Sequence, residues 1–518
     1  MREVMAPRTW FLLIFPILIV LVRRYLLAVL FGTRDQQKQQ QPHHHRLPPS
    51  PPALPVLGHL HLVGTQPHVS LRSLAKKHGM DVMLLRLGAM PVLVVSSPRA
   101  AEAVLRTHDH VFASRPHSLV AEVVLYGPSD VGFSPYGEYW RQARKLVTTH
   151  LLSARKVQSF RLAREEEVSA AMARIDEAAA AGVAVDVSEM FGSFTNDMAC
   201  RAVMGRSFRS EGRNKLFREL VADTSPLLGG FNVEEFFPFL ARFSVLSRVV
   251  RAKSERLRRR WDELLDRLID DHESEYDGES DPKDDDDFIN VLLSIRHEYG
   301  LSRQHMKAIL LDVFFGGIDT TASLLEYTIA ELMRRPHLMK KLQAELRTRI
   351  PKGQEVIAET DLADMAYLRA VIKESLRLRT VVPLLAPHFS VASCSIDGYV
   401  IPPGIRVLVN SGATARDARF WENPEEFVPE RFVDGGSAAD LGFKGNDFQF
   451  LPFGSGRRMC PGVNLGIATV QVILANLLHQ FDWQLPPGLD GRDIDMTEVF
   501  GLVVHRKKKL LLVPKSHV

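Results

Sequence analysis

The ten residues Phe453-Gly-Ser-Gly-Arg-Arg-Met-Cys-Pro-Gly462 constrain this chain more than any other segment. They place Cys460 on a glycine-rich loop directly before an apolar run, residues 463–480, whose periodicity predicts a helix. The start of a helix carries a partial positive charge and free backbone amides, which favour a thiolate and lower the pKa of a thiol. The segment predicts either a thiolate site or, more plainly, a buried cysteine in a glycine-rich turn.

The residues around Cys460 favour the first of these interpretations. Gly456 and Gly462 permit turns that other residues avoid, and they would let the backbone approach a flat cofactor closely. Arg458 could reach a carboxylate on that cofactor, and Phe453 could cover the sulfur and exclude water. The combination predicts a bound flat cofactor that carries carboxylate groups.

Composition excludes several other classes of protein. The chain has 518 residues but only 3 cysteines, and Cys200 and Cys394 lie far from Cys460, so neither a disulfide framework nor a structural zinc site is expected. With 65 basic and 61 acidic residues the formal charge is +4, which is too balanced to indicate nucleic-acid binding.

Three more segments have an unusual pattern. Glu374-Ser-Leu-Arg377 places an acid and an arginine on one helical face, which alone would be typical of a surface helix. Pro429-Glu-Arg-Phe432 supplies a further arginine, Arg431. Gly316-Gly-Ile-Asp-Thr-Thr321 brings two glycines and two hydroxyls into an apolar helix, which predicts a local kink or, alternatively, a flexible hinge.

The spacing Phe-x-x-Gly-x-Arg-x-Cys-x-Gly resembles the haem-binding signature of the cytochrome P450 family, and the other three segments occur in the order the family has. The resemblance implies a mainly α fold with small β-sheets, a haem b cofactor, and Cys460 as the axial ligand of the haem iron. It implies a structural triad of Glu374, Arg377 and Arg431 behind the haem.

Further roles follow from the same resemblance. Asp319 and Thr320 would deliver protons, while Thr321 is expected to point away from the iron. Trp140 and Arg144 match the Trp-x-x-x-Arg pattern of a haem-contacting helix. The family commonly has alanine where this chain has Gly316, which would widen the groove above the iron slightly.

Two more haem contacts are implied with less support from the sequence. Arg115 and His388 stand where many relatives hold the haem propionates, with ordinary surface roles as the alternative.

Residues 1–31 are predicted to form a single membrane-spanning anchor. Trp10 to Phe31 is apolar except around Arg23 and Arg24, and at about 22 residues it is long enough to cross a bilayer. A cleaved signal peptide and a shorter helix over Val4 to Val22 are the alternatives. The excess of basic residues after the span places the rest of the chain in the cytosol, on the endoplasmic reticulum membrane.

The anchor is followed by a tether and one large domain. Residues 32–56 are rich in Gln and His and then in Pro, which predicts a stiff hinge. Residues 57–518 show no second low-complexity break and predict one catalytic domain. Strands are expected at 82–87 and 91–96, and helices at 98–106, 139–149, 154–180, 251–274, 303–334, 337–348 and 367–378.

The function expected from the resemblance is insertion of one oxygen atom from O2 into a small lipophilic substrate. Electrons would come from NADPH through a separate cytochrome P450 reductase, because the chain has no Gly-x-Gly-x-x-Gly loop and no flavin domain. A haemoprotein that only senses a ligand, or one that rearranges peroxides, is disfavoured by the Asp319–Thr320 pair.

The substrate is expected from a closer likeness. The chain is similar in style to plant microsomal enzymes, and stretches such as Phe112-Ala-Ser-Arg-Pro116 and Tyr126-Gly-Pro-Ser-Asp130 resemble the grass hydroxylases of indole and indolinones. Hydroxylation of a terpenoid or another specialised metabolite is the alternative.

Overall fold

The computed structural model describes residues 46–517 except 128, 207–212, 231, 239–244, 276–286, 352–353 and 355. The predicted anchor and most of the tether lie outside these residues. Within them the chain is mainly helical with four small sheets, which confirms the predicted fold class.

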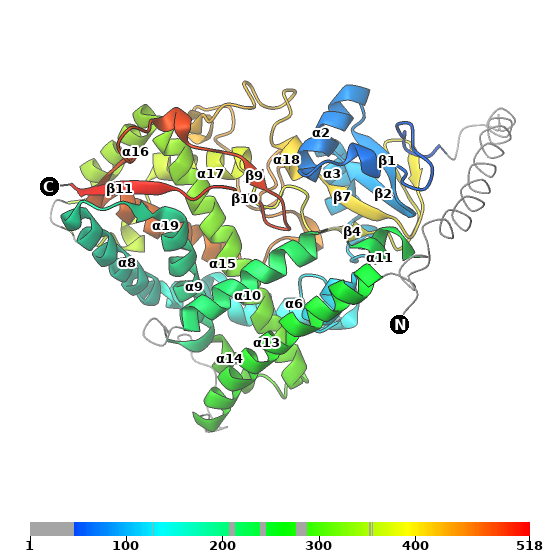
Figure 1. The fold of residues 1–518 in the computed structure, drawn as a ribbon, viewed down its shortest axis with the longest axis horizontal. Coiled ribbons are helices and arrows are strands. Elements are labelled where there is room, and N and C mark those ends of the chain that lie inside the picture. Colours follow the sequence, from blue (N-terminus) through cyan, green and yellow to red (C-terminus); the bar gives the residue numbers. More distant parts are fainter. Residues whose placement is uncertain are drawn as a thin grey trace, which may run out of the picture.

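Helix α15 (Arg303–Met333) runs through the centre of the molecule (Figure 1). It begins at a capping box between Ser302 and His305, and it packs against α9 (Val187–Met204), α10 (Arg213–Gly229), α17 (Ala366–Leu378) and α19 (Val463–Gln480). α15 and α19 are apolar and long enough to cross a membrane, but 61% and 50% of their apolar windows are buried inside the fold. They are core helices.

The largest sheet lies at one end of the molecule, beside α2 (Pro67–His78) (Figure 1). Its strand order is β1 (Val82–Leu87), β2 (Met90–Val95), β7 (Arg406–Val409) and β4 (His388–Phe389). β1 and β2 form an antiparallel hairpin, and β7 runs parallel to β2. This sheet brings His388 to the edge of the helical core.

Three smaller sheets complete the β structure. They are β3 (Val185–Asp186), β11 (Leu511–Ser516) and β8 (Phe481–Gln484); β5 (Cys394–Ile396) with β6 (Tyr399–Ile401); and β9 (Glu498–Val499) with β10 (His505–Arg506).

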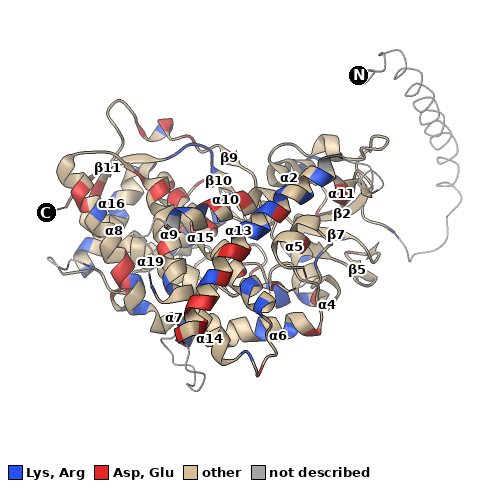
Figure 2. Ribbon diagram, turned by 60° about the horizontal axis from the view of Figure 1, so that its bottom comes forward, with Lys and Arg blue, Asp and Glu red and all other residues tan. Residues whose placement is uncertain are grey.

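The remaining helices cover the core. Longest among them is α13 (Val245–Glu275), which carries bands of acidic and basic residues along its length (Figure 2). The others are α3 (Pro98–Glu102), α4 (Asp109–Phe112), α5 (Leu119–Val124), α6 (Glu138–Leu146), α7 (Ala154–Ser159), α8 (Arg161–Ala181), α11 (Val233–Phe236), α14 (Phe288–Ser294), α16 (Pro336–Arg349) and α18 (Ser411–Thr414), with short 3-10 or π segments between them.

The sequence predicted the β1–β2 hairpin and the long helices α8, α13, α15, α16, α17 and α19 close to their observed bounds, with two kinds of error. Residues 154–180 were expected to form one helix, but the chain breaks at Phe160, whose buried ring packs edge-on against Phe288. Helices α2, α4, α5, α9, α10, α11, α14 and α18 and all strands after β2 were not predicted.

Candidate active site

A cavity of about 370 Å³ lies between α15, α9, α19 and the loop that carries Cys460. Most of its wall is apolar, including Phe133, Ile309, Leu324 and Leu502. Of the predicted cofactor and catalytic residues, the structure brings nine onto this wall: Arg115, Trp140, Arg144, Thr320, His388, Phe453, Arg458, Cys460 and Gly462. Gly456 and Asp319 lie off the wall. A second hollow of about 530 Å³, lined by Arg72, Arg379 and Arg416, contains none of them.

Cys460 faces the cavity from a tight loop. Its backbone amide donates a hydrogen bond to the Phe453 carbonyl, with an N–O distance of 2.9 Å. The residue has accessible surface, yet protein encloses the thiol, so that surface belongs to the cavity wall.

The predicted lowering of the Cys460 pKa is wrong for the protein alone. Burial raises the pKa of the thiol, and the opposing effects of the Gly462 amide and the Arg144 charge do not offset it. A metal ion deprotonates a coordinating thiol outright, so this sulfur suits a metal better than it suits a free thiolate.

The two glycines of this loop have different tasks. Gly456 has φ of +67°, and a Cβ there would lie 2.0 Å from the Leu105 carbonyl oxygen. Glycine is therefore required by the turn and by packing against protein, and the predicted close approach to a cofactor is wrong for this position. Gly462 precedes α19 with an ordinary φ of −86°, and a Cβ there would lie 3.8 Å from the Cys460 sulfur.

Arg458, Trp140 and Arg144 are held together at one end of the cavity. Arg458 donates to the carbonyls of Ala113 and Ser134, both at 2.6 Å, and its guanidinium lies 4.2 Å from the centre of the Trp140 ring. Arg144 donates to the Met459 carbonyl at 2.5 Å. The helix that carries Trp140 and Arg144 is thereby tied to the cysteine loop.

Arg115 and His388 belong to the same cluster. The Nε atom of Arg115 donates to the Gly132 carbonyl at 2.9 Å, and Nδ1 of His388 lies 2.8 Å from the Phe112 carbonyl. Arg115 is 8% exposed and His388 is 5% exposed. The alternative that these two are ordinary surface residues is therefore wrong.

The cationic cluster indicates which ligand this end of the cavity favours. Burial, followed by the charge of Arg115, lowers the pKa of Arg458 to about 8 and that of His388 to about 3. Burial also lowers the pKa of Arg115 to about 10. Carboxylate groups bound here would offset the repulsion between these cations and the free-energy cost of burying them. A haem, with two propionates on a flat apolar ring, fits these residues and the thiol of Cys460.

Two buried carboxyl groups near this cluster were not predicted. Asp312 of α15 lines the cavity and accepts a hydrogen bond from the Val131 amide at 2.6 Å. Asp130 accepts from the Phe133 amide at 2.5 Å. Burial raises the pKa of Asp312 to about 6, and burial together with the charge of Asp312 raises the pKa of Asp130. A single acid inside the apolar run 308–315 was the sequence signal for this site.

Thr320 of α15 also lies on the cavity wall. Its hydroxyl donates to the Gly316 carbonyl at 2.7 Å, which is the competition for a backbone carbonyl that the sequence predicted. α15 continues through both glycines as one helix. Thr321 also lines the cavity, and its direction relative to the iron stays a prediction.

Asp319 does not face the cavity. Its carboxylate lies 3.2 Å from Nε2 of His505, on β10. This contact could not be predicted from the sequence, because β10 is two residues long and lies 186 positions further along the chain.

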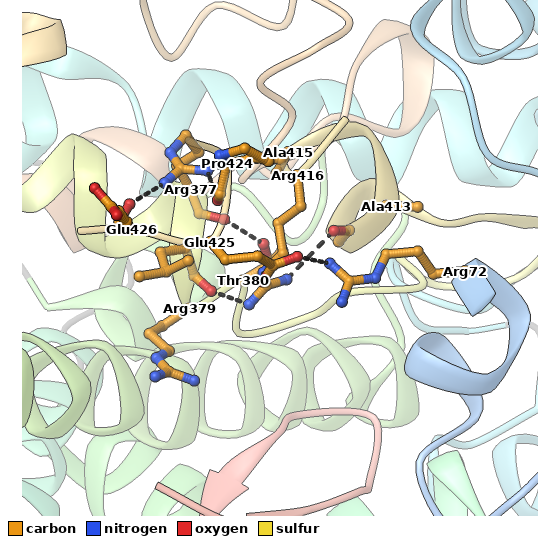
Figure 3. A network of polar contacts seen from close by, with 12 residues as sticks. Arg72, Arg377, Arg379, Thr380, Ala413, Ala415, Arg416, Pro424, Glu425 and Glu426 are labelled. Atoms are coloured by element: carbon orange, nitrogen blue, oxygen red, sulfur yellow. Dashed lines mark hydrogen bonds and ion pairs between the residues drawn. The ribbon is translucent and has the colours of Figure 1, made fainter. Parts of the chain in front are cut away.

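The three residues of the predicted triad lie together and are buried. Arg377 binds both oxygens of Glu374, at 2.7 and 2.8 Å, and Arg431 lies 3.5 Å from the same carboxylate. The other donors of Arg377 bind the carbonyls of Ala415, Pro424 and Glu426 (Figure 3). All five N–H donors of Arg377 thus have acceptors. Glu374 and Arg377 are 0% exposed, which excludes a surface helix pair.

Comparison with known proteins shows the family of the chain. The family model described as Cytochrome P450 matches residues 48–513. An indole-2-monooxygenase from Zea mays is 56% identical over 90% of this chain and 87% of its own length. An indolin-2-one monooxygenase from the same plant is 52% identical over 97% of this chain and 95% of its own length. A 3-hydroxyindolin-2-one monooxygenase, also from Zea mays, is 49% identical over 90% of this chain and 88% of its own length.

Proposed function

The chain belongs to the cytochrome P450 family and is a haem-dependent monooxygenase, and from this premise we propose that its substrate is a small indole or indolinone. The observation that carries the proposal is the common ring system in the names of three relatives that are 49–56% identical to this chain. The part of the cavity wall formed by Phe133, Ile309, Leu324 and Leu502 is apolar, which suits a small lipophilic ring system.

We propose the following roles at the haem. The haem supplies the iron at which O2 is activated, and Cys460 would be its axial ligand. Arg115, Arg144, Arg458 and His388 would neutralise or hydrogen-bond the propionates, and Trp140 would keep Arg458 in place. Phe453 would exclude water from the sulfur.

Thr320 would hold a proton-carrying water on the substrate side of the cavity. Its hydroxyl already donates to the Gly316 carbonyl, so its oxygen lone pairs remain available to accept a hydrogen bond from water. Asp319, the adjacent residue, would resupply the proton.

We propose that a separate NADPH–cytochrome P450 reductase is the redox partner of this enzyme. Helix α6 carries basic residues, blue in Figure 2. Arg141, which pairs with Glu138, and Lys145 are exposed, while Arg144 of the same helix donates to the Met459 carbonyl of the cysteine loop. A basic patch at this position would attract an acidic partner and place its electrons near the iron.

Residues 1–31 are proposed to anchor the enzyme to the endoplasmic reticulum membrane. Deletion of these residues should move most of the protein from the membrane pellet to the supernatant after sedimentation. A truncated protein that sediments as completely as the full chain would contradict the anchor.

The substrate is tested by turnover of purified enzyme with reductase and NADPH. Indole, indolin-2-one and 3-hydroxyindolin-2-one would be compared with monoterpenes of similar size, and hydroxylated products would be identified by mass spectrometry. We expect product from at least one nitrogen heterocycle at a kcat/KM at least about tenfold above any terpene, which is about 1.4 kcal/mol of discrimination. Faster terpene turnover would overturn the assignment.

A further inference from the structure

Helix α15 presents two different polar faces to two different environments. Gly316, Thr320 and Leu324 are four residues apart and line the cavity. Asp319, Ser323 and Glu326 follow one another at helical spacing and face β10 instead. The two faces meet at adjacent residues, Asp319 and Thr320, which are the proposed proton carriers.

His505 of β10 is in contact with this outer face through both ring nitrogens. Nε2 lies 3.2 Å from the Asp319 carboxylate, and Nδ1 lies 2.7 Å from the Ser323 hydroxyl. Ser323 is buried and fixes the orientation of the ring, so that Nε2 is directed at Asp319.

The contact with Asp319 is an ion pair without aligned hydrogen-bond geometry. The carboxylate oxygen nearest His505, Oδ2, has no hydrogen-bond partner among the described residues. This carboxylate oxygen is held by one imidazole, and the contact weakens once the imidazole loses its charge, whereas Glu374 accepts three hydrogen bonds.

His505 also has access to water from a side other than the cavity. Its side chain is 34% exposed, against 17% for Asp319, and His505 does not line the cavity. The order from solvent to the cavity is therefore His505, Asp319, Thr320.

We propose that His505 is a positioning residue that supplies protons to Asp319. The N–H bond at Nε2 breaks, its electron pair stays on the nitrogen, and an O–H bond forms on the Asp319 carboxylate. The neutral acid is no longer attracted to the imidazole, so it turns toward Thr320 and gives up the proton there. Nε2 then takes a new proton from water at its exposed side. The proposal rests on the roles given above to Asp319 and Thr320.

The charges around His505 suit this task. Burial lowers the pKa of the imidazole, but the contact with Asp319 and the charge of Glu326 outweigh burial and raise it above its ordinary value. Arg506, the next residue, is engaged with Glu326 at 2.8 Å. Among the described residues on β9, the strand paired with β10, Val499 lies opposite His505 and carries no charge.

The first test measures the protonation of His505 and needs no turnover. In the haem-loaded full chain, hydrogen exchange at C2 of each histidine, followed by mass spectrometry, gives the pKa of each imidazole. We expect a raised pKa at His505 in the wild type and a lower one in Asp319→Asn, because the carboxylate has been removed. His150, whose Nε2 lies 3.0 Å from the Tyr299 hydroxyl, should not change. An unchanged His505 would overturn the proposal.

The second test measures product formed per NADPH against pH, with any substrate that the enzyme oxidises. The imidazolium is lost as the pH rises through the His505 pKa, so wild-type coupling should fall with rising pH. His505→Gln cannot titrate, and it should give a low, pH-independent ratio, about tenfold below the wild type at low pH. This is less than the 10²-fold or more typical of a general acid, because water can still protonate Asp319.

Three further variants separate proton supply from a structural role. His505→Arg keeps a cation beside Asp319 but does not release its proton, since its pKa exceeds about 12. It should therefore fail to restore coupling, and full restoration would overturn the proposal. His150→Gln makes the same substitution at a distant histidine and should keep wild-type coupling. If His505→Gln does not fold, Ser323→Ala offers a second test, because it leaves the histidine in place but removes the hydroxyl that orients its ring. Ser323→Ala should also lower the product formed per NADPH. An unchanged ratio would refute the role proposed for His505.

Discussion

The buried Glu374–Arg377 pair and the face of α15 around Asp319 and Thr320 differ in how completely their polar groups are bonded. Around Arg377 every donor has an acceptor, and Glu374 also accepts from the Val428 amide at 2.7 Å. On α15, by contrast, Oδ2 of Asp319 has no hydrogen-bond partner with aligned geometry among the described residues, and an added Cβ at Gly316 or Gly317 would meet nothing within 4 Å.

This difference separates a part that must hold its shape from a part that must exchange water, protons and substrate. A buried polar group with all its hydrogen bonds made fixes one arrangement, and removing any member leaves another unpaired. Groups with unused hydrogen-bonding capacity, such as the Thr320 hydroxyl, can bind and release a water. Mutations of the Glu374–Arg377 pair should therefore lower haem content. Mutations of the polar residues on α15 should instead change how much of the NADPH consumed yields product and how much yields hydrogen peroxide.

The largest effect is expected for Cys460→Ser. A serine hydroxyl stays protonated and donates far less charge to iron than a thiolate does. The reduced protein with carbon monoxide should lose the absorption band typical of thiolate-ligated haem, together with all turnover. A variant that keeps this band would show that another residue binds the iron.

Glu374→Ala should prevent stable haem incorporation. It removes one partner of a fully buried ion pair and leaves Arg377 uncompensated, at a cost of roughly 3–5 kcal/mol. Haem content per protein and the unfolding midpoint measure the loss.

The matched control for Glu374→Ala is Glu102→Ala. Glu102 pairs with Arg106 on an exposed helix face at 3.5 Å, and exposed pairs contribute about 0.5 kcal/mol. Equal effects of the two substitutions would contradict the contrast between buried and exposed pairs.

The sequence predicted Cys460 and the Glu374–Arg377 pair better than it predicted the surroundings of Asp319 and Asp312 on α15. Cys460 and Glu374–Arg377 belong to local motifs, in which a helix or a loop alone fixes the spacing of the functional groups. The positions of Asp319 and Asp312 depend on segments distant in sequence, β10 and the loop at Val131. The pKa of Cys460 was predicted with the wrong sign because burial by the whole fold outweighs the local effect of the helix start.

Thr320→Ala should change the products without changing the fold. Haem content and substrate binding should stay close to the wild type, while product per NADPH falls several-fold and hydrogen peroxide rises, because the water that Thr320 holds is lost.

The control for Thr320→Ala lies on the same helix. Thr328 makes the same kind of bond, to the Leu324 carbonyl at 2.7 Å, but it is fully buried and off the cavity wall, so Thr328→Ala should stay coupled. Uncoupling by both variants would assign the effect to the helix and remove the role given to Thr320.

The smallest effect is expected for Gly316→Ala. Alanine lowers the backbone entropy lost on folding and suits a helix interior, so the free energy of unfolding should rise by about 0.5–1 kcal/mol. The new methyl group meets no protein atom within 4 Å and would narrow the cavity beside Thr320. Denaturant unfolding of the haem-loaded protein measures the first effect, and the KM for the largest accepted substrate measures the second. Gly317→Ala, which also has open space around its Cβ, should give the same gain in stability. If Gly316→Ala lost stability and Gly317→Ala did not, the helix next to Thr320 would need a backbone conformation that only glycine allows. The structure of α15 around Thr320 would then be as strictly determined by its residues as that of the Glu374–Arg377 pair.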